Sequence, residues 1–141
     1  MARRALVVAL VVVAVGVTAA PAGAVAHWKA FRTPSKNIGC LYVPAFDHVK
    51  AFLRCDILSG LEPRPTASCE LDWVGLMLHR IGKARPACAG DTVYKQHSHI
   101  LKYGHRWSLP GVACLSKRTG LRCRNTRGHG FVLAREHWSR F

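Results

Sequence analysis

The sequence has few acidic residues: seven Asp and Glu stand against 21 Lys and Arg in 141 residues. Glycoside hydrolysis needs two carboxylates at a set separation. Asp56 together with Asp72 or Asp91 could form such a pair, but no spacing in the sequence supports it. The chain also lacks a Gly-x-Ser-x-Gly turn, which argues against hydrolases built on that motif. No two cysteines have the Cys-x2–4-Cys spacing of a structural zinc site.

Long apolar runs are lacking as well, and the longest, residues 5–20, is shorter than the ~20 residues that a membrane-spanning helix needs. Two arginines precede this run, and two small-x-small stretches, Ala-Gly-Ala and Ala-Val-Ala, follow it. This order is typical of a secretory signal peptide, with an uncleaved anchor as the alternative. We predict that residues 1–26 are removed by cleavage after Ala26, or alternatively after Ala24. The Sec and twin-arginine export routes both stay open.

Cleavage would leave a single secreted domain of residues 27–141, with no membrane span. Only Arg3 and Arg4 are lost among the charged residues, so the formal charge changes from +14 to +12. We expect this domain to be extracellular and monomeric, with association to the cell envelope as an alternative, and to need no cofactor or metal.

Six cysteines follow the predicted signal, and an even number in a small exported chain is typical of a disulfide framework. Residues 117–120 (Lys-Arg-Thr-Gly) fit a tight hairpin turn with its glycine at positive φ, which would place Cys114 opposite Cys123. Cys40 and Cys55 flank a longer connection in the same way. Both segments read Cys-Leu … Leu-Arg-Cys, an echo that shared hairpin chemistry alone can explain. We therefore predict the pairs Cys40–Cys55, Cys69–Cys88 and Cys114–Cys123.

Short apolar runs alternate with turn residues, which favours strands over helices. Residues 69–80 are ambiguous, and because Gly75 weakens a helix we favour a strand plus a loop there. Residues 136–141 are expected to form a short helical turn, and the four tryptophans are expected in the core. The sequence thus predicts a mainly β fold, a small disulfide-stapled antiparallel barrel or sandwich. Its expected strands are residues 28–32, 38–43, 51–57, 112–116, 121–125 and 130–135.

A set of short motifs occurs in one order along the chain. They are Phe31-Arg-Thr-Pro-Ser-Lys-Asn-Ile-Gly-Cys40, Arg54-Cys-Asp-Ile57, Cys69-Glu-Leu-Asp-Trp73, Cys88-Ala-Gly-Asp-Thr92, Gly120-Leu-Arg-Cys-Arg-Asn125 and Gly128-His-Gly-Phe131. In this combination the chain resembles a family of small secreted actinobacterial proteins classed as a domain of unknown function. The resemblance covers residues 31–141. It implies an exported, disulfide-bonded domain and no particular reaction.

Basic residues concentrate near the C-terminus. On a strand, Arg122 and Arg124 would share one face, opposite Leu121 and Cys123. A one-sided basic face attracts polyanions, and salt weakens that attraction. We therefore predict a non-catalytic module that binds an anionic envelope polymer or an acidic protein, since export disfavours nucleic acid. The predicted anion-binding residues are Arg118, Arg122, Arg124, Arg127 and Arg135.

Two other classes of function remain open. A small secreted hydrolase would need a cleft in which a histidine and a carboxylate converge. A protease-inhibitor-like binder would use the exposed loop at residues 117–120. Histidines cluster only at His97, His99 and His105. On a strand, His97 and His99 would share one face, but no third ligand lies at a spacing typical of metal sites. A solvated loop is therefore favoured there over a metal site.

Overall fold

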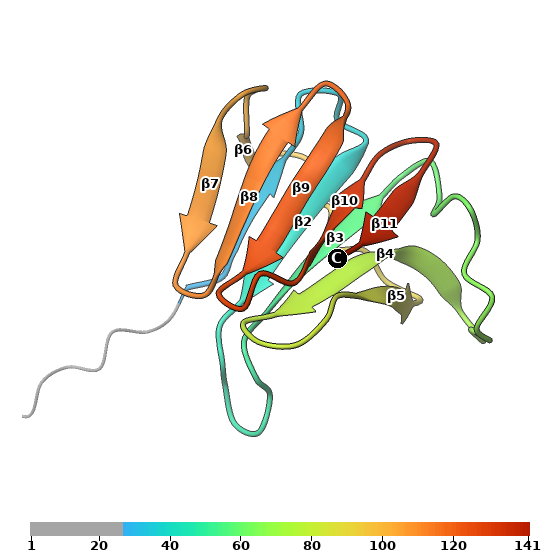
Figure 1. Ribbon diagram of the computed structural model, residues 1–141, viewed down its shortest axis with the longest axis horizontal. Helices are drawn as coiled ribbons and strands as arrows, with labels where there is room; N and C mark the ends of the chain where they lie inside the picture. The colour runs from blue at the N-terminus through green and yellow to red at the C-terminus, as the bar shows by residue number, and fades with distance from the viewer. Residues whose placement is uncertain (1–26) are drawn as a thin grey trace, which may run out of the picture.

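The computed structural model describes residues 27–141. The predicted signal peptide and its two candidate cleavage sites therefore lie outside the described residues. Within the described part, the chain forms eleven β-strands and no helix (Figure 1). No helix that could cross a membrane is therefore found in these residues.

The first sheet contains six strands in the order β5-β4-β3-β2-β1-β6. Strands β1 to β5 form an antiparallel meander, and β6 is added parallel to β1. A register shift between Trp73 and Gly75 interrupts the pairing of β4 with β5. The strands are β1 (Lys29–Arg32), β2 (Ile38–Val43), β3 (Phe52–Ile57), β4 (Asp72–His79), β5 (Arg85–Ala89) and β6 (His99–Ile100).

The second sheet is an antiparallel meander of five strands in the order β11-β10-β9-β8-β7. Side chains that point inward alternate with outward ones, as in β9, where Leu121, Cys123 and Asn125 are buried and Arg122 and Arg124 are exposed. The strands are β7 (Arg106–Leu109), β8 (Val112–Lys117), β9 (Gly120–Asn125), β10 (Gly130–Leu133) and β11 (Trp138–Arg140).

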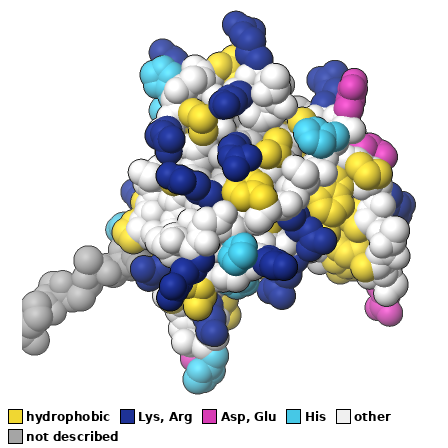
Figure 2. Space-filling view, viewed as in Figure 1, with side chains coloured by type: hydrophobic (Ala, Val, Ile, Leu, Met, Phe, Trp, Pro, Cys, Tyr) yellow, Lys and Arg dark blue, Asp and Glu magenta, His cyan; other side chains and the backbone are white. Residues whose placement is uncertain are grey.

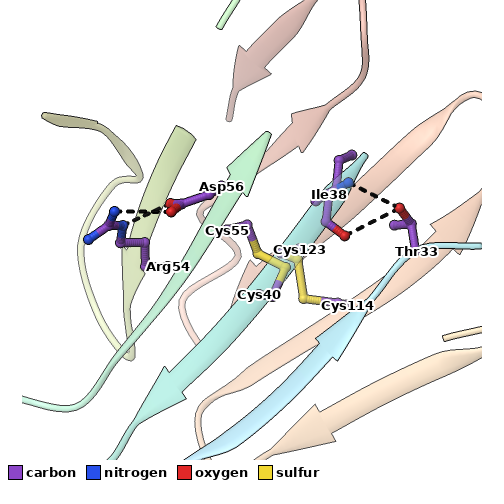
Figure 3. Close-up of a disulfide and its surroundings, with 8 residues drawn as sticks. All are labelled: Thr33, Ile38, Cys40, Arg54, Cys55, Asp56, Cys114 and Cys123. Atoms are coloured by element: carbon purple, nitrogen blue, oxygen red, sulfur yellow. Dashed lines mark hydrogen bonds and ion pairs between the residues drawn. A yellow bond between two sulfur atoms is a disulfide. The ribbon is translucent and has the colours of Figure 1, made fainter. Parts of the chain in front are cut away.

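The two sheets stack face to face around one hydrophobic core, which makes the fold a sandwich and not a closed barrel (Figure 1). Two disulfides lie in this core, Cys40–Cys55 joining β2 to β3 and Cys114–Cys123 joining β8 to β9 (Figure 3). Each joins directly opposite residues whose Cα atoms are 4.0 Å apart. The third, Cys69–Cys88, ties the segment before β4 to β5. The structure thus contains the two pairs that the hairpin argument predicts and the third pair, which follows by elimination.

The two meanders share one residue register. Cys40 pairs with Cys55, which pairs with Leu76; in the second sheet Cys114 pairs with Cys123, which pairs with Phe131. Outer strands follow the same rule, since Phe31 lies opposite Cys40 and Trp107 opposite Cys114. The Cys-Leu … Leu-Arg-Cys echo is therefore part of a larger structural repeat, in which β1–β5 correspond to β7–β11.

One glycine in each meander is required by close backbone packing. A Cβ atom on Gly75 would lie 1.9 Å from the carbonyl oxygen of Cys55, and one on Gly130 would lie 2.0 Å from that of Cys123. These positions correspond in the shared register, because Gly75 pairs with Asp56 and Gly130 with Arg124. The same crowding therefore excludes any larger residue at both places.

All six predicted strands are found within two residues of their expected bounds, and residues 72–79 form a strand as favoured. The helical turn expected at residues 136–141 is wrong: this segment turns back and pairs with β10 as β11. Trp28 is also not in the core, since it is 60% exposed at the beginning of the described chain, whereas the other three tryptophans pack against the core. Strands β5, β6 and β7 lie outside the strands that the sequence predicts.

Asn125 joins the two sheets at one end of the sandwich. Its side-chain amide donates to the carbonyl oxygens of His79, at 3.0 Å, and Gly82, at 2.8 Å. Its side-chain oxygen accepts from the backbone N–H groups of Arg127 and His129. The residue is only 5% exposed, so these four bonds satisfy groups that water does not reach freely.

We expect Asn125→Ala to lower the free energy of unfolding by about 2 kcal/mol, because it removes four part-buried hydrogen bonds to backbone groups of both sheets. Urea denaturation of the disulfide-intact protein measures this. Thr126→Ala is the matched control: it removes one exposed hydrogen bond to Arg80 and should cost less than about 0.5 kcal/mol. Equal losses for the two variants would contradict the assignment of Asn125 as an inter-sheet link.

Gly75→Ala and Gly130→Ala should each destabilise the protein by at least about 2 kcal/mol, because the added methyl group overlaps a neighbouring strand. Gly90→Ala provides the comparison, since a Cβ there meets only Leu71 at an ordinary 3.6 Å. Thermal unfolding of the three variants tests this. Either of the first two variants melting with wild-type stability would show that the two positions are not equivalent.

Candidate functional site

The outer face of each sheet, turned away from the core, differs sharply between the two meanders. On the first sheet, residues 90–94 cross this face, and we call them the strap. Val93 of the strap packs against Leu41 and Val43. The Tyr94 ring lies directly over Gly39, so close that a Cβ atom on Gly39 would be only 2.5 Å from the Cδ2 atom of Tyr94. The strap thereby buries the outer side of β2, which explains why all six residues of that strand are buried.

A cluster of charged groups fastens the strap to the first sheet. Arg54 donates from Nε and Nη2 to the two carboxylate oxygens of Asp56, at 2.8 and 3.0 Å (Figure 3), and from Nη1 to Asp91 at 2.9 Å. The Asp56 carboxylate also accepts from the Thr92 hydroxyl and the Val93 N–H. The side chains of Arg54 and Asp56 are 9% and 3% exposed, whereas that of Asp91 is 77% exposed.

The pKa values of this cluster follow from these contacts. Burial alone lowers the pKa of the Arg54 guanidinium, but its hydrogen bonds to Asp56 and Asp91 and their negative charges outweigh this effect and raise it. The hydrogen bond from Arg54, and then its positive charge, hold the pKa of the Asp91 carboxyl below the ordinary 3.8. Arg54 and Asp91 are therefore both charged near neutral pH.

The outer face of the second sheet carries cations, and no segment of the described chain crosses it as the strap crosses the first. Arg106, Lys117, Arg122 and Arg124 project from it, and we call this surface the basic face. None of the strands β7 to β11 contains an Asp or Glu. Figure 2 shows Lys and Arg side chains spread over this side of the molecule, with the acidic side chains at its margins. Among the described residues, no ion pair neutralises Arg122 or Arg124.

Apolar groups lie between these cations. Leu115 and Val132 flank Arg122 in the same row of the sheet, and both are partly exposed. The Arg122 guanidinium lies 3.8 Å from the centre of the Phe141 ring. Such stacking leaves the edge N–H groups of the guanidinium free to donate to a ligand.

A cleft of about 480 Å³ opens at the end of the sandwich where the β8–β9 turn lies. Thr33 and Ser35 line it from the first sheet, and Arg118 and Arg135 line it from the second. Glu136 and His137 complete the polar wall. Cations and hydroxyl groups together suit a ligand with both anionic and hydroxyl groups.

The five predicted anion-binding residues do not form one site. Arg122 and Arg124 lie on the basic face, and Arg118 and Arg135 line the cleft. Arg127 lies in the β9–β10 turn, at the opposite end of β9 from Arg118. Sequence reasoning missed Arg106, because β7 was not recognised as a strand. The alternation of polar and apolar residues in Arg106-Trp-Ser-Leu109 could have indicated this strand. In the structure its polar residues are exposed and its apolar residues are half-buried.

The geometry gives little support to hydrolytic chemistry. A second cleft, of about 380 Å³, does bring Asp56 and Asp72 together. However, both carboxylate oxygens of Asp56 are occupied by Arg54 and the strap, so Asp56 is held as a structural anion. The histidine–carboxylate contact between His48 and Asp47 is exposed on the connection between β2 and β3, and neither residue lines a cleft of the described chain.

Two other predicted features now have positions. His97, His99 and His105 are all exposed, and no group of three or more possible metal ligands occurs within residues 27–141. In the β8–β9 hairpin Lys117 pairs with Gly120, whose φ is +135°. Only Arg118 and Thr119 lie in this turn, which leaves no extended segment of the kind that a protease cleft binds.

The Asp91 contact predicts a pH dependence. A carboxyl group with a lowered pKa stabilises the fold fully above its ordinary value, and this contribution is lost as pH falls through the lower value of the folded protein. The stability difference between wild type and Asp91→Asn should therefore be largest at neutral pH and shrink below about pH 4. Urea denaturation at several pH values checks this, with Glu70→Gln reporting the loss of an exposed carboxylate elsewhere. A difference that grows on acidification would contradict the Arg54–Asp91 contact.

No curated protein and no solved structure matches the chain. One family model does match, over residues 8–141, and it describes a family of unknown function. The match spans the whole sandwich, both disulfide-bonded hairpins and the strap, in agreement with the resemblance of the ordered motifs. Because it covers nearly the entire sequence, the chain belongs to the family of unknown function DUF6636.

Proposed function

We propose that this protein is a secreted, non-catalytic module whose basic face binds an anionic partner at the cell envelope or in the extracellular medium. The observation that carries this proposal is the charge separation between the sheets. Carboxylates of the chain itself neutralise Arg54 in the first sheet, whereas within residues 27–141 Arg106, Arg122 and Arg124 in the second sheet face solvent without one. Three disulfides in a domain of this size fit an oxidising environment outside the cell.

The arrangement of the basic face suits an extended anion better than a single small one. Its four cations are distributed along β7, β8 and β9, and residues two apart on a strand, such as Arg122 and Arg124, lie about 7 Å from each other. A polymer with repeated phosphates or carboxylates can contact several of them at once. Repeated weak contacts then add up to retention that a monovalent anion would not give.

This function predicts binding that depends on where the charges lie. We expect the exported protein to be retained on phosphate-rich cell-wall polymer at low salt and released as the salt concentration rises. Arg122→Glu/Arg124→Glu should elute at clearly lower salt than Lys50→Glu/Lys83→Glu. Both double variants change the net charge equally, but the second pair lies in exposed loops outside the basic face.

Affinity chromatography over a salt gradient makes the measurement. Equal elution of the two double variants would mean that net charge alone causes retention, and the basic face would lose its assigned role. Absence of retention at low salt, tested also on carboxylate-bearing polymer, would reject the proposal altogether.

A further inference from the structure

The shared register of the two meanders permits a comparison of their outer faces residue by residue. Leu41 pairs with Arg54, which pairs with Met77; in the second sheet Leu115 pairs with Arg122, which pairs with Val132. An arginine flanked by two apolar side chains therefore occupies the same place on both sheets. In the first sheet this place is the binding site of the strap.

The strap shows what such a place binds. It supplies the Asp91 carboxylate to Arg54 and, two residues later, the Val93 side chain to Leu41. Between them, Thr92 donates its hydroxyl to Asp56. An extended segment with an acidic residue, a hydrogen-bonding residue and an aliphatic residue in succession is thus complementary to this arrangement.

In the second sheet the chemistry of this place differs, since Lys117 corresponds to Val43 and Ala113 to Gly39, and a cation stands where Asp56 has its carboxylate. The residue that corresponds to Asp56 is Arg124, because Asp56 pairs with Gly75 and Arg124 with Gly130. A ligand in the place of Thr92 would therefore meet a cation and not a carboxylate. A ligand complementary in charge to Arg124 would therefore carry a second acidic side chain in the place of the Thr92 hydroxyl.

The face is open to such a segment. Arg106, Arg122 and Arg124 are exposed and Leu115 is half-buried, whereas Leu41 and Arg54 on the first sheet are buried. Within residues 27–141, Phe141 packs over Gly130 and against Arg122, which leaves the Leu115 side of Arg122 uncovered by it.

We propose that the basic face binds an extended acidic segment of a separate protein in the manner of the strap. Two consecutive acidic residues pair with Arg122 and Arg124, and the aliphatic residue that follows packs against Leu115. This inference rests on the proposed function and narrows its anionic partner to a peptide of the pattern acidic–acidic–aliphatic.

The test uses peptides that copy the strap, whose residues 90–94 read Gly-Asp-Thr-Val-Tyr. The probe is Gly-Asp-Glu-Val-Gly with blocked ends, because Ala113 fills the place that Gly39 leaves open for the Tyr94 ring. Its comparison is Gly-Asp-Glu-Ser-Gly, which has the same charge. Titration into the isotopically labelled, exported protein is followed by amide chemical shifts. We expect shifts centred on β8 and β9, and about tenfold weaker binding of the serine peptide, because the buried aliphatic contact is lost.

Protein variants locate the contacts. Arg122→Gln and Arg124→Gln should each weaken the valine peptide about tenfold through loss of a charge-assisted hydrogen bond, whereas Lys50→Gln, outside the face, should leave it unchanged. The unperturbed spectrum of each variant away from the face reports that it is folded.

The alternative outcomes separate this inference from the proposed function. Equal binding of both peptides, or retention on anionic polymer without peptide binding, would overturn the acidic–acidic–aliphatic pattern while anion binding stands. If neither the polymer nor the peptide binds, both the proposed function and this inference are wrong. Concentration-dependent shifts at β8 and β9 without any peptide would make a second copy of the chain the occupant, and the separate partner would be wrong.

Discussion

The two cross-strand disulfides in the core determine which side of each sheet every other residue occupies. Each joins directly opposite positions of a hairpin, Cys40 with Cys55 and Cys114 with Cys123. Side chains alternate along a strand, so a slip of one residue would turn every core residue to solvent. With the cysteines facing inward, their neighbouring arginines necessarily face outward. The core, the strap site and the basic face all follow from that orientation.

One framework is used twice, with different results on its outside. In the first meander Arg54 lies among carboxylates from its own chain, and the strap makes that face part of the folded interior. In the second meander the corresponding Arg122 remains exposed beside Arg124. The first arrangement stabilises the domain by satisfying a buried charge. The second leaves charge and apolar surface together on an accessible sheet.

Local sequence patterns predicted the strands that alternate clearly between apolar and polar residues, but not those whose own pattern is weak or interrupted. The turn at residues 117–120 and the alternation through Arg122 and Arg124 are readable because a tight turn places its own strands together. By contrast, β5 contains Pro86, which is unusual inside a strand, and β11 has only three residues. Neither segment therefore shows a clear strand pattern. β11 is a strand because β10 supplies its hydrogen-bond partners. The prediction of a helical turn at residues 136–141 was wrong because it did not take this pairing into account.

The sequence by itself determined the oxidised framework, the β class and the side of the strand on which Arg122 and Arg124 lie, because cysteine spacing and two-residue periodicity are local properties. It could not distinguish Leu53-Arg-Cys55 from Leu121-Arg-Cys123, which read alike. Only the tertiary structure decided that the first arginine is buried and paired while the second is exposed. The reason is that the Asp91 carboxylate, 37 residues from Arg54, reaches one and has no counterpart on the other among the described residues. Whether such an arginine holds the fold together or faces solvent depends on which segment crosses above it.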